Sequence, residues 1–127
     1  MIIDKTYRRK VLSYANGSTY IVTVPKEVKE GMGLDTGFIA QMEFNDEKRE
    51  ITVSFMESAS DDEEAVERKV MSINEQLVFT IPAKKAKEYG IDDNTIVELD
   101  GDIDKKQLTI QVNGKDMSGI NEVEENE

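Results

Sequence analysis

The sequence predicts a mainly β protein with short helices, built from two tandem copies of one strand–helix–hairpin unit. Residues 20–55 align with residues 77–112 without a gap, at a constant separation of 57 residues. Runs of β-branched and aromatic residues open both segments, which is typical of strands. A repeat of this length indicates one duplicated structural unit. Because a unit of roughly 50 residues buries little surface by itself, we expect the two copies to share one core.

The repeat divides the chain of 127 residues into four segments. Residues 1–56 form the first copy and residues 67–114 form the second. Between them, residues 57–66 are small and acidic without periodicity, which predicts a flexible linker. The acidic tail, residues 115–127, has a composition that predicts disorder in the free protein.

Within each copy the expected order is strand, loop, strand, short helix and hairpin. The second strand of each copy ends at a proline, which lacks a backbone donor but suits the first turn of a helix. The helix then ends at a glycine, the residue that most readily adopts the left-handed conformation after a helix. These segments are Tyr20–Val24, Pro25 and Gly33 in the first copy and Leu77–Ile81, Pro82 and Gly90 in the second.

A hairpin follows each glycine. In the first copy, alternating apolar residues over 38–44 predict a strand with one buried face, and the polar run 45–48 predicts its turn. In the second copy, Asp100-Gly101-Asp102 is the predicted turn. The returning strands are predicted at Ile51–Phe55 and Leu108–Val112, where apolar and polar residues alternate.

The order of motifs resembles the swapped-hairpin domain of the AbrB, SpoVT and MazE transcription factors and antitoxins. An Arg-Lys-Val strand precedes a branched residue and proline, a helical turn, Gly-Leu or Gly-Ile, an acidic turn and a hairpin. The residues that carry this resemblance are Arg9-Lys10-Val11, Val24-Pro25 and Gly33-Leu34-Asp35, and then Arg68-Lys69-Val70, Ile81-Pro82 and Gly90-Ile91-Asp92. The resemblance covers nearly the whole chain outside the linker and tail. It implies a swapped-hairpin β-barrel, in which the hairpins of two copies interleave.

In this family the two copies normally come from two chains. With both copies in one chain, we expect the barrel to close as an intramolecular, monomeric pseudo-dimer. A linker of roughly ten flexible residues has a reach of about 17 Å, which is enough to cross a small barrel. The alternative is a homodimer in which each copy pairs with its equivalent in a second chain.

The resemblance also implies contacts with double-stranded DNA. Members of the family that bind DNA use basic residues of the first strand and its following loop. The matching DNA-binding residues here are Arg8, Arg9, Lys10, Arg68 and Lys69. We expect lysines at the two helix starts, Lys26, Lys84 and Lys85, to add phosphate contacts. A purely structural interpretation is also open, because charged residues on strand edges commonly prevent edge-to-edge association.

Part of the family's DNA-reading pattern is absent. Thr23 and Thr80 stand where the MazE branch places an arginine, two residues before the proline. The loop Asn16-Gly17-Ser18 of the first copy becomes Asn74-Glu75-Gln76 in the second. Because Glu75 would repel phosphate, DNA binding predicts either that the two halves read unequal half-sites or that one half binds weakly.

The net charge of −11 is concentrated outside the two copies. The linker holds five acidic residues and no basic one, and the tail holds five acidic residues and one lysine. The folded body is therefore near neutral, so the total charge does not by itself exclude DNA as a partner.

The composition narrows the possible chemistry. The chain has no cysteine and no histidine, which excludes disulfides, thiolate or histidine metal sites and histidine-based catalysis. The sequence contains no nucleophile motif or Gly-rich phosphate loop, so we expect neither an enzyme nor a cofactor. It also lacks an apolar run of signal-peptide or membrane-spanning length, so we expect a cytoplasmic protein without a membrane partner.

The sequence is compatible with three functions, of which we expect the first named here. It is a double-stranded DNA-binding transcriptional regulator. The second is an antitoxin whose tail binds a toxin or another basic protein through Met117, Ile120 and Val123, which are spaced three apart within negative charge. The third is an acidic inhibitor or nucleic-acid mimic that does not bind DNA.

Overall fold

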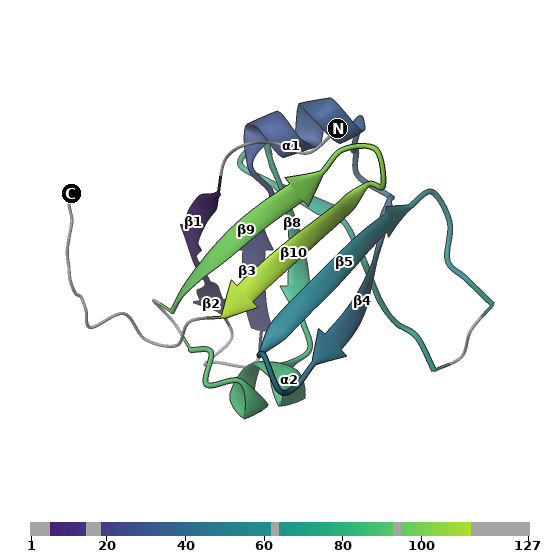
Figure 1. The fold of residues 1–127 in the computed structure, drawn as a ribbon. Helices are drawn as coiled ribbons and strands as arrows, with labels where there is room; N and C mark the ends of the chain where they lie inside the picture. The colour runs from purple at the N-terminus through teal and green to yellow at the C-terminus, as the bar shows by residue number, and fades with distance from the viewer. Residues whose placement is uncertain (1–5, 15–18, 62–63, 93–94, 113–127) are drawn as a thin grey trace.

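Strands dominate the part of the chain that the structure describes. The computed structural model describes residues 6–14, 19–61, 64–92 and 95–112, whose arrangement Figure 1 shows. The helices are α1 (Lys26–Met32) and α2 (Ala83–Glu88). The strands are β1 (Tyr7–Lys10), β2 (Leu12–Tyr14), β3 (Thr19–Thr23), β4 (Ile39–Asn45), β5 (Glu50–Met56), β6 (Val66–Lys69), β7 (Met71–Ile73), β8 (Gln76–Ile81), β9 (Ile96–Asp102) and β10 (Gln107–Val112). The prediction of a mainly β protein with short helices is confirmed.

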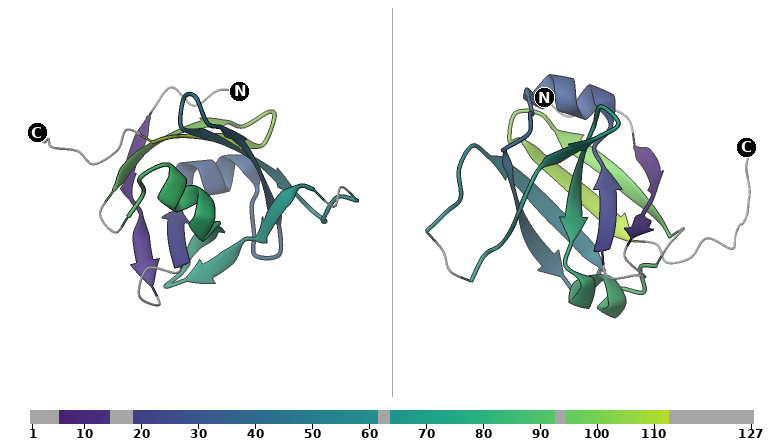
Figure 2. Two further views of the ribbon diagram at one scale, coloured as in Figure 1. Left: turned by 90° about the horizontal axis from the view of Figure 1, so that it is seen from below. Right: turned by 180° about the vertical axis from the view of Figure 1, so that it is seen from behind.

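The strands form two sheets. Six of them lie in the order β1-β9-β10-β5-β4-β6, and four lie in the order β2-β3-β8-β7. The chain passes from one sheet to the other at Val11, between β1 and β2, and at Val70, between β6 and β7. Seen from the end, the two sheets curve around a shared interior (Figure 2). The described residues therefore form two sheets joined by these bends, and not one closed ring of strands.

The two bends have the same hydrogen bonding. The Val11 N–H donates to the Thr95 carbonyl at 2.9 Å, and the Val70 N–H donates to the Phe38 carbonyl at 2.8 Å. Thr95 and Phe38 occupy the same position in their repeats. Both bends interrupt what the sequence alone indicates as one strand.

The hairpin of each half pairs with the first strand of the other half. The hairpin β9–β10 lies between β1 and β5, and the hairpin β4–β5 pairs along its other edge with β6. Each first strand therefore depends on the opposite half of the chain for its neighbour in the six-stranded sheet.

The strand register gives the molecule an approximate two-fold axis. Val22 of β3 lies opposite Phe79 of β8, and Thr52 of β5 lies opposite Thr109 of β10. The members of each pair are 57 residues apart, so they are equivalent positions of the repeat. Because equivalent residues face each other in both sheets, the axis passes through the two pairs.

The two helices close opposite ends of the molecule (Figure 1). Pro25 and Pro82 stand immediately before them with φ of −58° and −54°, values that the proline ring sets in advance. Gly33 and Gly90 follow them with φ of 68° and 74°, in the left-handed region that glycine adopts without strain. The predicted helix limits are confirmed within one residue.

The core lies between the two sheets. The alternation predicted over 38–44 is confirmed, since Ala40 and Met42 are buried and Phe44 packs partly against them. Near the axis, Phe79 is fully buried and meets Phe55 edge-to-face, with 6.0 Å between ring centroids. The apolar positions that the repeat shares therefore form one continuous core.

The predicted turn at Asp100-Gly101-Asp102 is wrong. β9 continues through Asp102, and the turn lies at 103–106, which is 57 residues after the first hairpin's turn at 46–49. Arg49 and Lys106, the last residues of the two turns, both have φ of 51°. Gly101 is buried and pairs with Leu108, so its place in the ladder outweighs the turn-forming composition.

The segment expected to be a flexible linker makes contacts with the first strand of the second half. The Ser60 hydroxyl donates to Glu67 Oε2 at 2.6 Å, and the Ser60 N–H donates to the same oxygen at 3.2 Å. β6 begins at Val66, which we had placed in the linker. The described part of this segment is therefore anchored at Ser60.

Candidate nucleic-acid interface

The predicted basic residues of the first strands lie at two equivalent positions. β1 and β6 form the opposite edges of the six-stranded sheet. Lys10 lies opposite Ile96 in β9, and Lys69 lies opposite Ile39 in β4. These two pairings match through the repeat, so the approximate two-fold axis relates the two basic segments.

Arg9 and Arg68 hold their guanidinium groups in the same way. Arg9 Nη1 donates to the Arg8 carbonyl at 2.9 Å, and Arg68 Nη1 donates to the Glu67 carbonyl at 2.9 Å. The Arg9 guanidinium also lies 5.3 Å from the centre of the Tyr7 ring. A guanidinium has five N–H donors, so one bond to the main chain leaves capacity for a phosphate or a base edge.

The residue before these arginines differs between the halves. Arg8 Nη2 lies 3.3 Å from Glu98 Oε2 across β1 and β9. The equivalent positions hold Glu67 and Gln41, and the Gln41 amide donates to Glu67 at 3.0 Å. Hydrogen bonds from Ser60 and Gln41 lower the pKa of Glu67 below its usual value, so this residue is anionic at neutral pH. At this position one half therefore has an ion pair, Arg8 with Glu98, and the other has an anion, Glu67, bonded to a neutral amide; two cations follow in each half.

Both basic segments lead into the edges of the four-stranded sheet. The bends at Val11 and Val70 carry the chain into the edge strands β2 and β7. Large apolar side chains are exposed on these strands: Leu12 at 42%, Met71 at 41% and Ile73 at 37%. This sheet is thus flanked at two diagonal corners by cationic segments, whereas its edge strands carry apolar side chains.

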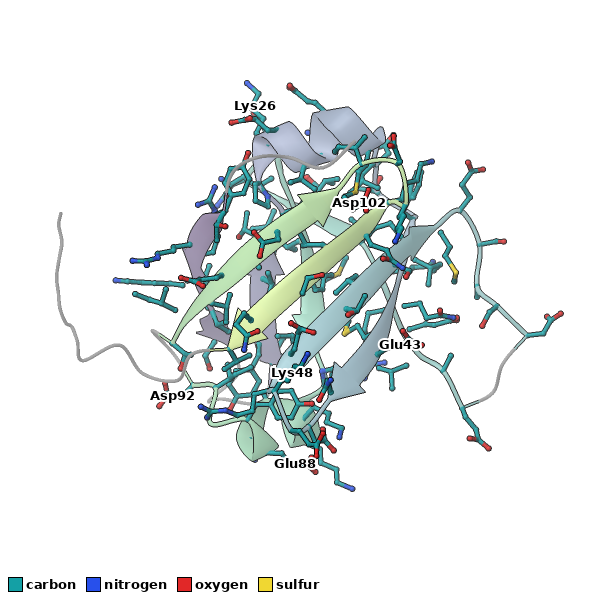
Figure 3. All side chains as sticks on the ribbon, viewed as in Figure 1. Lys26, Glu43, Lys48, Glu88, Asp92 and Asp102 are labelled. Carbon is teal, nitrogen blue, oxygen red and sulfur yellow. The ribbon has the colours of Figure 1, made fainter. Side chains whose placement is uncertain are left out.

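The predicted helix lysines lie at the two ends of the molecule, where Figure 3 marks Lys26 on α1 and Glu88 on α2. Lys26 is exposed beside a hollow of about 310 Å³ that Lys29 and Glu75 also line. Glu75, which we expected to repel phosphate, therefore lines the same hollow as Lys26 and Lys29. Lys84 is exposed on α2.

Lys85 is engaged within the protein. Its Nζ lies 3.2 Å from Asp46 Oδ1 and 3.3 Å from Glu88 Oε1, and 5.2 Å from the centre of the Phe44 ring. The hydrogen bond to Asp46 raises the pKa of Lys85 above its usual value. Because two carboxylates already neutralise this amine, its geometry suits a structural role better than the phosphate contact that we predicted.

Asp46 and Tyr89 complete this cluster, and the sequence analysis identified neither. The Tyr89 hydroxyl donates to Asp46 Oδ1 at 2.5 Å. This bond and that from Lys85 hold the pKa of Asp46 below its usual 3.8. Because 43 residues separate Tyr89 from Asp46, no local pattern indicates their contact.

Several predicted sites lie outside the described residues. These are the loop Asn16-Gly17-Ser18 and the tail residues Met117, Ile120 and Val123. Across the part of the chain that the structure describes, no group of three or more Asp, Glu, His or Cys side chains could hold a metal ion. Within the same residues, neither helix is long and apolar enough to span a membrane.

The chain matches no protein-family model, no curated protein and no solved structure.

Proposed function

We propose that the chain is a double-stranded DNA-binding transcriptional regulator with a swapped-hairpin fold of the AbrB/MazE type, in which both hairpin-exchanging halves belong to one chain. The exchange of hairpins supports this fold: β9–β10 pairs with β1, and β4–β5 pairs with β6. In such an arrangement each half supplies its hairpin to the other. The approximate two-fold axis through Val22 and Phe79 is the relationship that two separate chains would have in a homodimer.

One observation carries the proposed DNA binding. The axis relates Arg9-Lys10 of β1 to Arg68-Lys69 of β6, at two corners of the four-stranded sheet. Duplex DNA has its own two-fold symmetry, so two related cationic segments can contact equivalent phosphates of the two strands. Arg9 and Arg68 also keep donors for base edges, where arginine pairs with guanine.

The two halves bind DNA with unequal strength in this proposal. Arg8 of the first half is balanced by Glu98, whereas Glu67 at the equivalent position of the second half leaves a net negative charge beside neutral Gln41. A carboxylate near the phosphates weakens binding by charge repulsion. We therefore expect an operator with one well-bound half-site and one weaker half-site.

Binding to DNA from beside the gene tests the proposal. Fluorescence anisotropy should show affinity that falls steeply with salt, since each neutralised phosphate adds about 0.9 to the logarithmic slope. Arg9→Ala/Arg68→Ala should weaken binding by about 10- to 100-fold and lower the slope by about two. Lys48→Ala/Lys105→Ala removes the same charge from the two hairpin turns and should change binding little. Absence of binding at low salt would refute the proposal.

A second candidate is an acidic inhibitor or nucleic-acid mimic that binds a basic protein. The neutralised cations favour it, because Lys85 is held by Asp46 and Glu88, and Arg8 by Glu98. The net charge of −11 also favours binding to a basic protein. If the protein binds no DNA at low salt, capture of a basic protein that high salt releases would support this candidate.

A further inference from the structure

Each end of the molecule is a joint between the helix of one half and the hairpin turn of the other (Figure 1). The α2 joint comprises Phe44 and Asp46 of the first hairpin with Lys85 and Glu88 of α2 and Tyr89, the residue that follows it. The equivalent α1 joint comprises Gly101 and Ile103 of the second hairpin with Val28, Gly31 and Met32 of α1. The two joints have the same place in the fold but different chemistry.

The α2 joint is polar and aromatic. Asp46 accepts a hydrogen bond from the Tyr89 hydroxyl at 2.5 Å and one from Lys85 Nζ at 3.2 Å. Tyr89 is 2% exposed and meets Phe44 edge-to-face, with 6.3 Å between ring centroids. The hairpin turn is therefore held on α2 by a carboxylate that needs a phenol and an amine opposite it.

The α1 joint is apolar and closely packed. Val28 is fully buried, Met32 is 2% exposed, and Ile103 packs against the same core. A Cβ atom added at Gly31 would lie only 2.6 Å from Ile103 Cδ1. This joint has no room for a side chain at the position where α2 carries Glu88.

Pairing between two like halves would mismatch both kinds of joint. In a pair of first halves, Asp46 would face Val28 and Met32 and would lose both hydrogen-bond donors. In a pair of second halves, Ile103 would face Lys85 and Glu88, and the buried Tyr89 hydroxyl would lose its acceptor. In the same pair of second halves, Gly101 would stand where Phe44 packs against Tyr89, which would leave a cavity beside the tyrosine ring.

We propose that these two joints make the pairing selective, so that each half of this chain fits the other half and rejects a second copy of itself. The inference is independent of DNA binding, because none of these residues belongs to the basic segments of β1 and β6. It also goes beyond the tether, which raises the local concentration of the opposite half but does not choose between partners.

Cutting the linker separates selectivity from the tether. A protease site inserted after Asp61 allows the folded protein to be cut, and the two pieces are then unfolded and refolded together. Thr52→Cys and Thr109→Cys place thiols opposite each other in a mixed pair, and the chain has no other cysteine. A short thiol cross-linker then records the partners by mass.

The expected result is a large excess of mixed pairs. Random association would give as many like pairs, of both kinds together, as mixed pairs. We expect mixed pairs to exceed like pairs by at least about tenfold, which is the effect of a 1.4 kcal/mol preference. Equal amounts of mixed and like pairs from the native sequence would overturn the proposal.

Substitutions in the α2 joint test whether its residues cause the excess of mixed pairs. Asp46→Ile/Lys85→Val/Tyr89→Met gives three of the five α2-joint positions the residues of the α1 joint and removes the hydrogen-bonded cluster, so the excess of mixed pairs should fall towards equality. Asp46→Asn, which keeps an acceptor but loses the charge, should reduce the excess less and serves if the triple variant does not fold. Glu47→Gln changes an exposed charge in the same turn and should leave the excess unchanged. An undiminished excess in the Asp46 variants would refute the role of this joint.

Discussion

Thr52 lies opposite Thr109 at the centre of the pairing between β5 and β10, although the two residues are equivalent positions of different repeats. The same relationship holds for Val22 and Phe79 in the other sheet. Two strand pairs, one in each sheet, are thus centred on a single axis. The duplication visible in the sequence is also the symmetry of the fold.

The first prediction concerns this pairing in the uncut chain. Thr52→Cys/Thr109→Cys should form an internal disulfide without dimerisation, because directly facing residues of antiparallel strands have Cα atoms about 4.5–5.5 Å apart, within the range that a disulfide spans. The link should raise the free energy of unfolding by about 2–4 kcal/mol, since it closes a long loop. Denaturant titration with and without reductant measures the effect. Covalent dimers of the single variant Thr52→Cys would instead show that first halves pair between chains.

The second prediction concerns stability in acid. Hydrogen bonds from Tyr89 and Lys85 hold the pKa of Asp46 below its usual 3.8. Since the folded state lowers this pKa, the stabilisation is complete above the usual value and is lost as the pH falls through the lowered one. Asp46→Asn should therefore lower the urea midpoint at neutral pH and flatten its decline below about pH 5.

Asp61→Asn is the matched control for Asp46→Asn, because Asp61 is an exposed aspartate on the loop between the halves. It should leave the acid profile almost unchanged. Glu67→Gln should also flatten the profile, since the bonds from Ser60 and Gln41 lower the pKa of Glu67. An Asp46→Asn variant with the wild-type profile would contradict the assigned role of this cluster.

The third prediction concerns Tyr89. Burial and the hydrogen bond to Asp46 raise the pKa of Tyr89 far above its usual 10.0. Of the four tyrosines in the chain, Tyr89 should therefore ionise late, that is, at a pH well above the usual tyrosine range. Its contribution to stability should be complete below about pH 10 and should be lost only as the pH rises through the raised pKa. Ultraviolet titration of the folded protein should show this late fraction.

Tyr89→Phe should remove the late fraction and lower the free energy of unfolding by about 1 kcal/mol, the net value of one hydrogen bond. Tyr20→Phe, at another buried tyrosine, should leave the late fraction in place. A late fraction that survives in Tyr89→Phe would show that another phenol accounts for it.

The fourth prediction concerns packing on the axis. Phe79 is fully buried and meets Phe55 edge-to-face, so Phe79→Ala should destabilise the protein by about 3–5 kcal/mol. Phe38→Ala removes the same atoms from a half-buried position and should cost clearly less. Chemical denaturation of both variants measures the difference, and equal losses would contradict a core centred on Phe79.

Much of this fold could be predicted from the repeat and from local pattern. Pro25, Gly33 and their counterparts mark helix limits because proline and glycine restrict or permit particular backbone angles. The alternation over 38–44 identifies a buried face because a strand turns every second side chain inward. Such signals depend only on neighbouring residues, so they can be read without the fold.

Features that depend on distant partners could not be predicted in this way. The bends at Val11 and Val70 carry no glycine or proline and arise because the chain pairs with different sheets on either side of them. The basic segments of β1 and β6 were recognised, but their neutralising partners were not. Glu98 faces Arg8 from the opposite half of the chain, and no spacing rule connects them.

The exchange of hairpins within one chain has a further consequence for how the two ends can change. In an assembly of two identical chains, any substitution appears at both ends, so a carboxylate introduced at one joint must be accommodated at its mirror position. Here Asp46 and Ile103 are encoded separately, although they occupy the same place in the fold. Joining the halves therefore frees each end to acquire its own residues without a simultaneous change at the other.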